Sequence, residues 1–314
     1  MKNIKSILIE VLVKSYKKFD KMKKFDKPSF FLDNSTNSET ACFILAGYKE
    51  FTLDIVFKRI KQFCPENIDV CIVSSGLYSE DLKKIAEDYN WSYISMKRNC
   101  VTLALNSAIR EFKSAKNIFK LDEDIFITEG FFNSLLKVHE ESKKDYFPCF
   151  SAPLIPLNAY CYRRILEKLE LTQKYTELFE YPKITTGIRA KIDNDSDVAK
   201  FFWGRGDYIP QIDELNRKIK NDSMKVNYSV CPIRFAIGAI FFERKILEDN
   251  SWFPVTIVGN GMGADERFLC NLATTKSNAI IVSERQVVGH LGFGEQNNEM
   301  ENYFKNNKEF FEIH

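Results

Sequence analysis

Three consecutive acids, Asp122, Glu123 and Asp124, lie between apolar segments in residues 119–127 (FKLDEDIFI). In an extended strand, residues i and i+2 share a face, so Asp122 and Asp124 can point together while Glu123 points away. Two carboxylates held this close repel each other, and a hard cation such as Mg²⁺ or Mn²⁺ between them relieves that repulsion. The pattern therefore predicts a cation site, and the alternative from these residues alone is a solvated acidic turn.

The segments before the acids alternate between short apolar runs and helical patterns. Such alternation indicates an α/β fold with a mainly parallel sheet, and such sheets bind ligands at the carboxyl ends of their strands. We therefore expect the loops after the strands to converge on one crevice. The predicted strands are residues 41–47, 70–73, 91–96 and 117–121, the predicted helices are 53–63, 79–90 and 101–112, and the loops are 47–49, 74–76, 97–99 and 122–124.

The second half of the chain is less regular. Its predicted helices are residues 131–146, 160–181 and 264–274, and its predicted extended segments are 150–158, 234–242 and 279–282. Residues 183–231 form a polar excursion, and a glycine-containing loop at 255–263 opens the last of these helices. The expected organisation is thus 1–38 (N-terminal helix and linker), 39–130 (first half of the α/β domain) and 131–314 (second half, with the excursion 183–231).

The composition is that of an ordinary globular protein, with 45% hydrophobic and 28% charged residues over 314 positions. The net charge of +2 argues against general nucleic-acid binding. Eight cysteines are scattered singly without a CxxC pair, which predicts reduced core residues rather than a zinc site. No apolar run approaches the ~18 residues of a membrane span, so we expect a cytoplasmic protein.

Residues 1–27 carry nine lysines against three acids, with apolar residues at helical spacing. This pattern predicts a basic amphipathic helix. Such a helix can lie on an anionic membrane surface, which makes a peripheral location on the inner face of the membrane one interpretation. The alternative is a helix that packs on the domain or on a second subunit, so a homo-oligomer is left open. Residues 28–38 have the composition of a linker.

Taken in order, these features resemble a GT-A fold glycosyltransferase. The first strand and turn, the serine and glycine loop at 74–76, the basic pair at 97–98 and the DxD acids carry the resemblance, which covers residues 41–295 outside the excursion. It is nearest to inverting enzymes of glycosyltransferase family 2 and to related galactosyltransferases and chondroitin synthases. Three later features are similar to that group: residues 238–244 (GAIFFER), residues 261–269 (GMGADERFL) and His290 before Leu291-Gly292.

The resemblance implies a divalent cation, Mn²⁺ or Mg²⁺, held by Asp122, Asp124 and His290. A departing nucleoside diphosphate develops negative charge that such a cation neutralises. The resemblance also implies a carboxylate base for the acceptor hydroxyl, placed at Glu266, with Asp265 gripping the acceptor sugar; which of the two acids is the base is left open. A carboxylate base without a covalent nucleophile implies inversion at the sugar.

The remaining site residues follow from the same resemblance. For the donor they are Ala46, Gly47, Tyr48, Ser75, Arg98, Asp122 and Glu123, with Tyr48 available to stack on the base, and for the acceptor they are Asp265 and Trp203. Serine at 75 departs from the acid that the family often has there, which leaves the identity of the base open. Trp203 has an alternative role, which is to anchor the excursion through packing.

The implied function is a metal-dependent inverting transfer of a sugar, expected from a UDP-sugar, to a glycan or lipid-linked acceptor, as in bacterial capsule or lipopolysaccharide synthesis. Two rivals stay open. A haloacid-dehalogenase-type phosphohydrolase also has a nucleophile in an apolar DxD context, although that acid normally follows the first strand. The other rival is a non-catalytic carbohydrate-binding relative that keeps the fold without the base.

Overall fold

The computed structural model describes residues 8–13, 15, 24–187, 190–221, 226–256 and 258–314. Most of the amphipathic helix predicted over residues 1–27 lies outside these ranges; of it, residues 8–13 and 15 are helical and exposed. Within the described ranges, every helix is too short or too polar to traverse a lipid bilayer.

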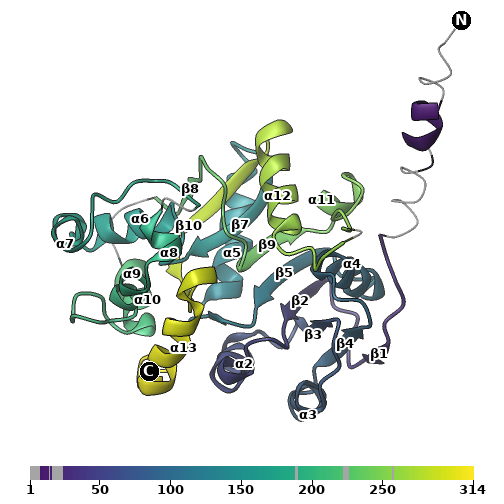
Figure 1. Cartoon of the computed structure of the whole chain (residues 1–314), viewed down its shortest axis with the longest axis horizontal. Coiled ribbons are helices and arrows are strands. Elements are labelled where there is room, and N and C mark those ends of the chain that lie inside the picture. The colour runs from purple at the N-terminus through teal and green to yellow at the C-terminus, as the bar shows by residue number, and fades with distance from the viewer. Residues whose placement is uncertain (1–7, 14, 16–23, 188–189, 222–225, 257) are drawn as a thin grey trace, which may run out of the picture.

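A nine-stranded sheet forms the centre of the molecule, in the order β1-β4-β3-β2-β5-β9-β7-β10-β8 (Figure 1). β2 pairs in parallel with β3 and β5, β3 with β4, and β7 with β10, whereas β1, β8 and β9 pair antiparallel to their neighbours. The strands are β1 (Phe30–Leu32), β2 (Thr40–Leu45), β3 (Asp69–Ser75), β4 (Ser92–Met96), β5 (Asn117–Asp122), β6 (Ile125–Phe126), β7 (Pro148–Leu154), β8 (Tyr228–Val230), β9 (Ala239–Glu243), β10 (Ala279–Val287) and β11 (Gly289–His290).

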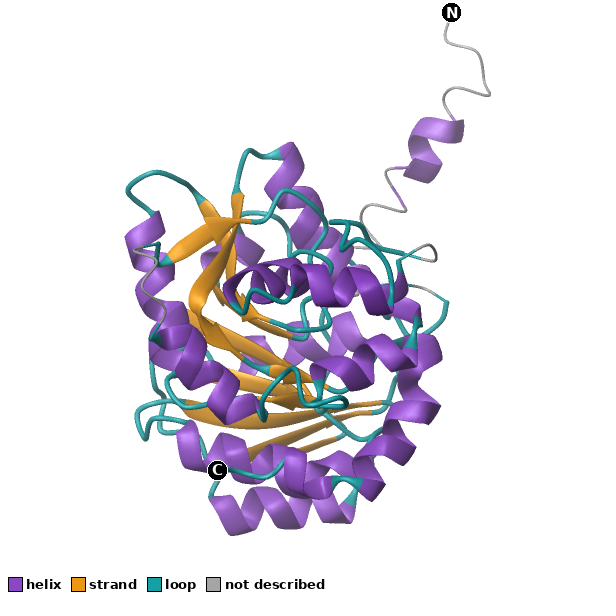
Figure 2. Ribbon diagram, turned by 90° about the vertical axis from the view of Figure 1, so that its left-hand side faces the viewer, coloured by secondary structure: helices purple, strands orange, loops and turns teal. Residues whose placement is uncertain are grey.

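Helices cover both faces of this sheet, as Figure 2 shows. Helix α4 packs on β2 and β3, whereas α5 packs on β7 and β10. The α-helices are α2 (Leu53–Phe63), α3 (Glu80–Tyr89), α4 (Val101–Glu111), α5 (Phe131–Ser142), α6 (Cys161–Lys168), α7 (Thr172–Leu178), α8 (Lys191–Asn194), α9 (Ser196–Phe202), α10 (Ile212–Lys220), α11 (Lys245–Glu248), α12 (Ala264–Thr275) and α13 (Asn297–Asn306). Short 3₁₀ turns are η1 (Glu50–Thr52), η2 (Gly294–Gln296) and η3 (Lys308–Phe310). The predicted α/β fold with a mainly parallel central sheet is confirmed.

The core lies where the apolar runs of the sequence cross the sheet. Strand β2 buries Ala41, Cys42, Phe43 and Ile44 completely because it is central and covered on both faces, and such strands are apolar throughout rather than alternating. Helix α3 begins at a serine cap, where the Ser79 hydroxyl accepts the backbone N–H of Leu82. The parallel pairing of β2 with β3 and β5, and of β3 with β4, places the carboxyl ends of these four strands at the same edge of the sheet.

The structure departs from the predicted elements in three places. The segment predicted as a linker, 28–38, contains β1, which pairs antiparallel with β4 at the edge of the sheet. A second sheet of only two strands, β6 and β11, forms directly after β5 and β10, with His290 opposite Ile125. Much of the predicted polar excursion is helical, because α8, α9 and α10 lie within residues 183–231.

Candidate functional site

The three acids after β5 each turn to a different partner. Strand β5 ends at Asp122, so the chain leaves the extended conformation before Asp124 and strand alternation does not govern all three side chains. The Asp122 Oδ1 atom lies 2.6 Å from the Lys120 ammonium, and the Glu123 carboxylate accepts the backbone N–H groups of Gly47 and Tyr48. The Asp124 carboxylate contacts Lys49, in the loop after β2, and His290 on β11.

The Asp124 Oδ2 atom is shared by two nitrogen atoms. His290 Nε2 lies 3.3 Å from it, and the Lys49 ammonium lies 2.5 Å from it. Burial alone would raise the pKa of Asp124, but the imidazole and the ammonium hold it well below its ordinary value. Asp124 is therefore an anion in a largely buried position, with its side chain only 5% exposed.

Packing behind His290 fixes its position. His290 lies on β11 opposite β6, and its ring meets the Phe293 ring edge-on at 4.3 Å between centroids. Trp203 donates its indole N–H to the backbone oxygen of His290 at 3.1 Å, and a Cβ added at Gly289 would collide with the Trp203 ring. Glycine therefore occurs next to His290 because the tryptophan fills the adjacent space.

The position of Trp203 contradicts its predicted role in binding the acceptor sugar. Its ring is buried, packed against Phe126 and Phe311, so it presents no face for stacking on an acceptor sugar. The alternative raised from the sequence, that it anchors the excursion, is what these contacts favour. The physical reason is that a large aromatic ring gains more by closing a cluster around β6 and the C-terminal segment than by remaining exposed.

The loop after β2 contacts the loops after β5 and β3. Glu123 binds the N–H groups of Gly47 and Tyr48, while the Tyr48 hydroxyl donates to the backbone oxygen of Ser75 at 2.6 Å. Burial raises the pKa of Glu123 and the backbone N–H groups oppose this shift. Tyr48 is 60% exposed, so its ring face is accessible. Ala46, also predicted at the donor site, is buried and donates to Val73 in β3.

The loop after β4 joins this group. Ser75 Oγ accepts the backbone N–H of Cys100 at 2.7 Å, and the Arg98 guanidinium donates to the backbone oxygen of Thr256. Ser75 is buried, so its side chain is used in joining two loops. Arg98 is half-buried and ties the loop after β4 to the loop that precedes α12. The predicted convergence of loops is therefore seen as direct contacts.

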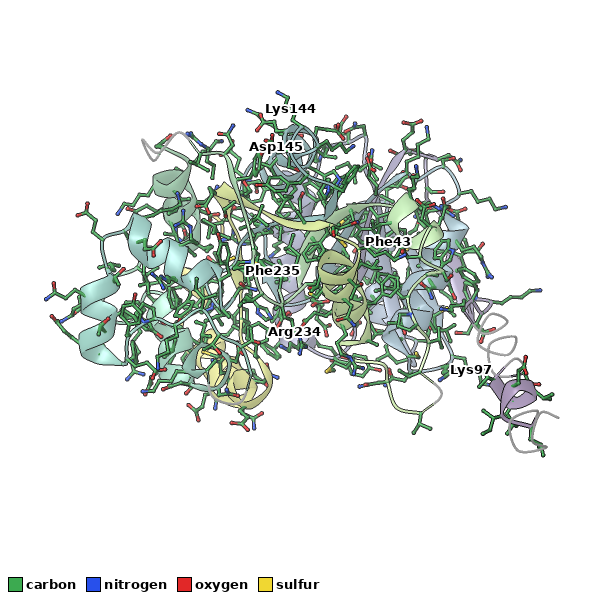
Figure 3. The ribbon with its side chains drawn as sticks, turned by 90° about the horizontal axis from the view of Figure 1, so that it is seen from above. Phe43, Lys97, Lys144, Asp145, Arg234 and Phe235 are labelled. Atoms are coloured by element: carbon green, nitrogen blue, oxygen red, sulfur yellow. The ribbon has the colours of Figure 1, made fainter. Side chains whose placement is uncertain are left out.

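Asp265 and Glu266 occupy the first turn of α12, where acids complement the helix dipole. Asp265 is buried, and Glu266 forms an ion pair with Arg234, a residue that sequence reasoning did not select. Burial raises the pKa of Glu266 and Arg234 opposes this shift. In Figure 3, Arg234 lies near the centre of the view beside Phe235, whereas Lys144 and Asp145 lie at the upper edge of the molecule.

Lys120 connects the DxD acids to α12. Burial would lower the pKa of its ammonium, but Asp122, Asp265 and Glu266 raise it, so all three carboxylates lie within electrostatic reach. The ammonium also donates to the backbone oxygen of Ile237 at 3.0 Å, and a Cβ on the adjacent Gly238 would meet Asp122 at 3.5 Å. Segments predicted separately therefore meet around one buried lysine.

The donor set fits a divalent cation in kind, because carboxylate oxygen and imidazole nitrogen are both suitable ligands for Mn²⁺. The structure brings together two predicted ligands, Asp124 and His290, whereas Asp122 is bound to Lys120. Across the part of the chain that the structure describes, no three His, Cys, Asp or Glu side chains are grouped as a metal site. The Lys49 ammonium, 2.5 Å from Asp124 and 3.0 Å from Asn297 Oδ1, already supplies a positive charge beside the Asp124 carboxylate.

Four polar residues of this site were not singled out from the sequence, namely Lys49, Lys120, Arg234 and Asn297. A signal existed for Lys120: it lies in an apolar strand two residues before Asp122 and so shares its face. Nothing in the local sequence indicates that Asn297 belongs to the site, because its contact with Lys49 depends on how helix α13 folds back on the domain.

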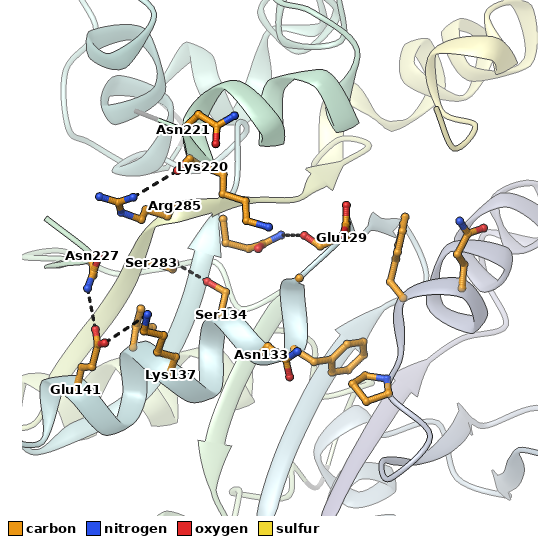
Figure 4. Close-up of a pocket in the computed structure, with 17 residues that line it drawn as sticks. Glu129, Asn133, Ser134, Lys137, Glu141, Lys220, Asn221, Asn227, Ser283 and Arg285 are labelled. Atoms are coloured by element: carbon orange, nitrogen blue, oxygen red, sulfur yellow. Dashed lines mark hydrogen bonds and ion pairs between the residues drawn. The ribbon is translucent and has the colours of Figure 1, made fainter. Parts of the chain in front are cut away.

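A separate cavity of about 720 Å³ lies between α5, α10 and β10, and none of the predicted site residues lines it (Figure 4). Its polar side chains bind one another: Ser134 contacts Ser283 at 2.9 Å, and Asn227 donates to Glu141 at 3.1 Å. A smaller cavity of about 240 Å³ opens beside Gly47 between α2 and α3. The candidate site is therefore identified by the side-chain contacts between the converging loops, because the larger of these two cavities lies elsewhere.

No protein-family model matches this chain, and no curated protein matches it. Among solved structures it is similar to the mannosyltransferase PcManGT from Pyrobaculum calidifontis in complex with GDP-Man and Mn²⁺, with 12% identity, a TM-score of 0.47, and coverage of 89% of this chain and 64% of that one. It is also similar to GalNAc-T7 with UDP, GalNAc and Mn²⁺, with 14% identity, a TM-score of 0.47, and coverage of 83% and 45%. The chain spans less than two thirds of either protein.

Proposed function

We propose that this chain is a metal-dependent glycosyltransferase that moves a sugar, with inversion, from a nucleotide diphosphate donor to an acceptor hydroxyl. The observation that carries the proposal is the contact between Asp124 and His290, which joins the DxD loop to a distant histidine at the carboxyl edge of the sheet. The two acids on α12, Asp265 and Glu266, interact electrostatically with Lys120, which also pairs with Asp122 of the DxD loop. This link through Lys120 and Asp122 supports a proposal in which the metal ligands and the base act on the same substrate, as a displacement reaction requires.

In this proposal the donor nucleotide lies over the loops after β2, β3 and β4. The exposed ring of Tyr48 stacks on the base, and the backbone around Ala46, Gly47 and Ser75 shapes its site. Glu123 orders the Gly47-Tyr48 turn through two backbone N–H groups, so its role is to position the loop. Arg98 contributes positive charge near the phosphates.

Asp124 and His290 would hold a divalent cation, with Asp122 as a third ligand or as a group that binds the ribose. When bound, such a cation neutralises charge on the departing diphosphate. Burial raises the pKa of Asp122, and the Lys120 ammonium, which lies against that carboxylate, opposes this shift and orients the side chain. Imidazole among the ligands favours Mn²⁺ over Mg²⁺.

Glu266 serves as the base in this proposal, and Asp265 binds the acceptor sugar. A base needs a carboxylate whose pKa is above the ordinary value and which is still ionised at neutral pH, and burial raises the pKa of Glu266. Arg234 opposes this rise and so favours the ionised carboxylate in the absence of acceptor. The acceptor hydroxyl transfers its proton to Glu266 as its oxygen forms the new bond to the sugar, and the diphosphate leaves from the opposite side.

The donor, the acceptor and the location of the enzyme are proposed from the sequence and its family resemblance. We propose a UDP-sugar as donor and a glycan or lipid-linked acceptor of bacterial surface polysaccharide synthesis, such as capsule or lipopolysaccharide. The lysine-rich residues 1–27 support a cytoplasmic enzyme that binds the inner face of the membrane. Removing residues 1–27 and measuring flotation with anionic liposomes tests this location, because unchanged flotation would contradict it.

The function is tested by incubating the purified chain with a panel of nucleotide sugars and Mn²⁺. We expect slow release of the nucleoside diphosphate with one donor, and loss of that release in Asp124→Asn. Asp54→Asn is the matched control, because Asp54 is an exposed acid on α2 that pairs with Lys58, and it should retain the wild-type rate. Release of inorganic phosphate from phosphomonoesters, with no diphosphate from any nucleotide sugar, would favour the phosphohydrolase instead.

A further inference from the structure

Two lysines neutralise the two aspartates of the DxD loop, and they differ in how they are held. Lys120 pairs with Asp122 at 2.6 Å, its side chain is 4% exposed, and its ammonium also donates to a backbone oxygen. Lys49 pairs with Asp124 at 2.5 Å, but its side chain is 24% exposed. Lys120 is therefore a fixed part of the core, whereas Lys49 reaches the site from its solvent-facing side.

The backbone of Lys49 is anchored independently of its ammonium. The Lys49 backbone oxygen accepts both the N–H and the hydroxyl of Thr52, and that hydroxyl also lies 2.7 Å from the backbone oxygen of Glu123. The hydrogen bonds to Asp124 and Asn297 are made by the terminal ammonium of the side chain. The ammonium can consequently leave Asp124 by side-chain rotation, without any change in the loop.

Lys49 and a metal ion would compete for the same oxygen atom. The ammonium lies on Asp124 Oδ2, which is also the atom nearest to His290 Nε2, so a cation bound between the aspartate and the histidine would take that place. A unit positive charge and a divalent cation within a few ångströms repel each other strongly in a buried site. Both cannot occupy the site together.

We propose that Lys49 is an exchangeable internal counter-ion that occupies the metal position when no divalent cation is bound and must be displaced for the cation to enter. This inference rests on the proposed metal role of Asp124 and His290. Lys49 keeps the buried carboxylate neutralised in the empty site, and it makes metal binding weaker than the ligands alone would give. Metal affinity is thereby set by a residue that is not itself a ligand.

The test measures Mn²⁺ affinity without nucleotide, by titration calorimetry or by the electron spin resonance signal of free Mn²⁺. Lys49→Met should bind Mn²⁺ about tenfold more tightly than the wild type, because the competitor is gone. Lys49→Arg retains the positive charge and should keep the wild-type affinity. Lys58→Met is the matched control: it removes the same charge from an exposed pair with Asp54 on α2 and should leave the affinity unchanged.

A thermal-unfolding measurement gives an independent readout. Without metal, Lys49→Met should melt at a lower temperature than the wild type because Asp124 loses one of its two partners and keeps only His290, and saturating Mn²⁺ should raise its melting temperature by more than it raises that of the wild type. If Lys49→Met does not fold, Asn297→Ala removes the other partner of the ammonium and should tighten Mn²⁺ binding about twofold; unchanged or weaker binding there would count against the proposal.

The outcomes separate this inference from the proposed function. Equal or weaker Mn²⁺ binding by Lys49→Met, with clear binding by the wild type, would overturn the counter-ion role and leave the metal site intact. Absence of Mn²⁺ binding in both proteins would overturn the metal role and this inference with it. Tighter binding in Lys49→Met and Lys58→Met alike would assign the effect to net charge and so reject a specific role for Lys49.

Discussion

His290 Nε2 lies 3.3 Å from Asp124 Oδ2, so the last strand of the chain, β11, contributes to the loop that follows β5. The contact depends on the small β6–β11 sheet, in which His290 pairs with Ile125, the residue after Asp124. Because β6 comes directly after the acids and β11 directly after β10, the ends of two distant strands of the large sheet are joined. Backbone pairing between β6 and β11 therefore brings the Asp124 carboxylate and the His290 imidazole together.

His290→Gln should weaken Mn²⁺ binding by at least about tenfold while leaving the fold intact, because an amide replaces the imidazole nitrogen beside Asp124. Titration calorimetry of the metal-free protein measures the change. His139→Gln is the matched control: His139 is also buried, but its Nδ1 lies 2.9 Å from the Ser151 hydroxyl on β7 and it is not among the proposed metal ligands. Equal affinity in the wild type and His290→Gln would remove His290 from the proposed ligand set.

The two acids of α12 are separated by conservative substitution. Glu266→Gln should retain donor binding and reduce transfer by about 10²- to 10⁴-fold, because the amide cannot accept the acceptor proton. Asp265→Asn should raise the KM for the acceptor with a smaller effect on kcat. Donor binding is followed by nucleotide fluorescence displacement and transfer by product analysis. The reverse pattern would make Asp265 the base and Glu266 the acceptor-binding residue.

Arg234 should control the pH dependence of transfer. The base acts when ionised, so activity falls as pH decreases through the pKa of Glu266, which burial raises and Arg234 lowers. Replacing Arg234 with Gln removes the opposing charge, so the pKa rises further and the acidic limb of log kcat/KM moves to higher pH. Arg205→Gln, which removes an exposed pair with Asp197, is the control and should not move the limb. An unmoved limb in Arg234→Gln would show that another group titrates.

The fold was predictable because apolar runs of strand length alternate with helical patterns in the first half of the chain. Strand β2 and helix α12 lie close to their predicted bounds for this reason. Strand β10 was predicted to end at residue 282 but extends to Val287, through a polar run. Glu284 in that run is fully buried because Arg164 and Lys168 pair with it, and such partners cannot be read from a local pattern.

The site was predictable as a set of loops and acids, but not as a set of charge pairs. The carboxyl ends of parallel strands converge by topology, so the DxD acids could be placed with the loops after the other parallel strands, whereas the α12 acids were placed with them only through the family resemblance. Lys49 and Arg234 were indistinguishable from solvated surface charges, because only the tertiary fold decides which lysine or arginine meets a buried carboxylate. Trp203 was misassigned for a related reason: an aromatic residue in a polar segment gives no sign of whether its ring is buried.

His139 should make the protein less stable in acid. Burial lowers its pKa from 6.5 to about 4, so the folded state keeps the imidazole neutral while the unfolded chain takes up a proton below pH 6.5. The unfolded state is therefore favoured progressively as pH falls from about 6.5 to 4, with roughly 2 kcal/mol lost at pH 5. Urea unfolding at pH 7.5 and 5 measures this loss. His139→Gln should abolish that part of the pH dependence, while His314→Gln, at the exposed C-terminus, should retain it.

Gly289→Ala should weaken metal binding without altering a ligand. A Cβ at this position collides with the Trp203 ring, so either the tryptophan or β11 must move, and His290 lies on that strand. We expect a stability loss of about 1–3 kcal/mol, typical of overpacking, together with weaker Mn²⁺ binding. Gly294→Ala is the control, because a Cβ there meets no atom within 4 Å. Adding Trp203→Leu to Gly289→Ala makes room for the methyl group and should recover part of the metal affinity; failure of both variants to change Mn²⁺ binding would disconnect Trp203 packing from the position of His290.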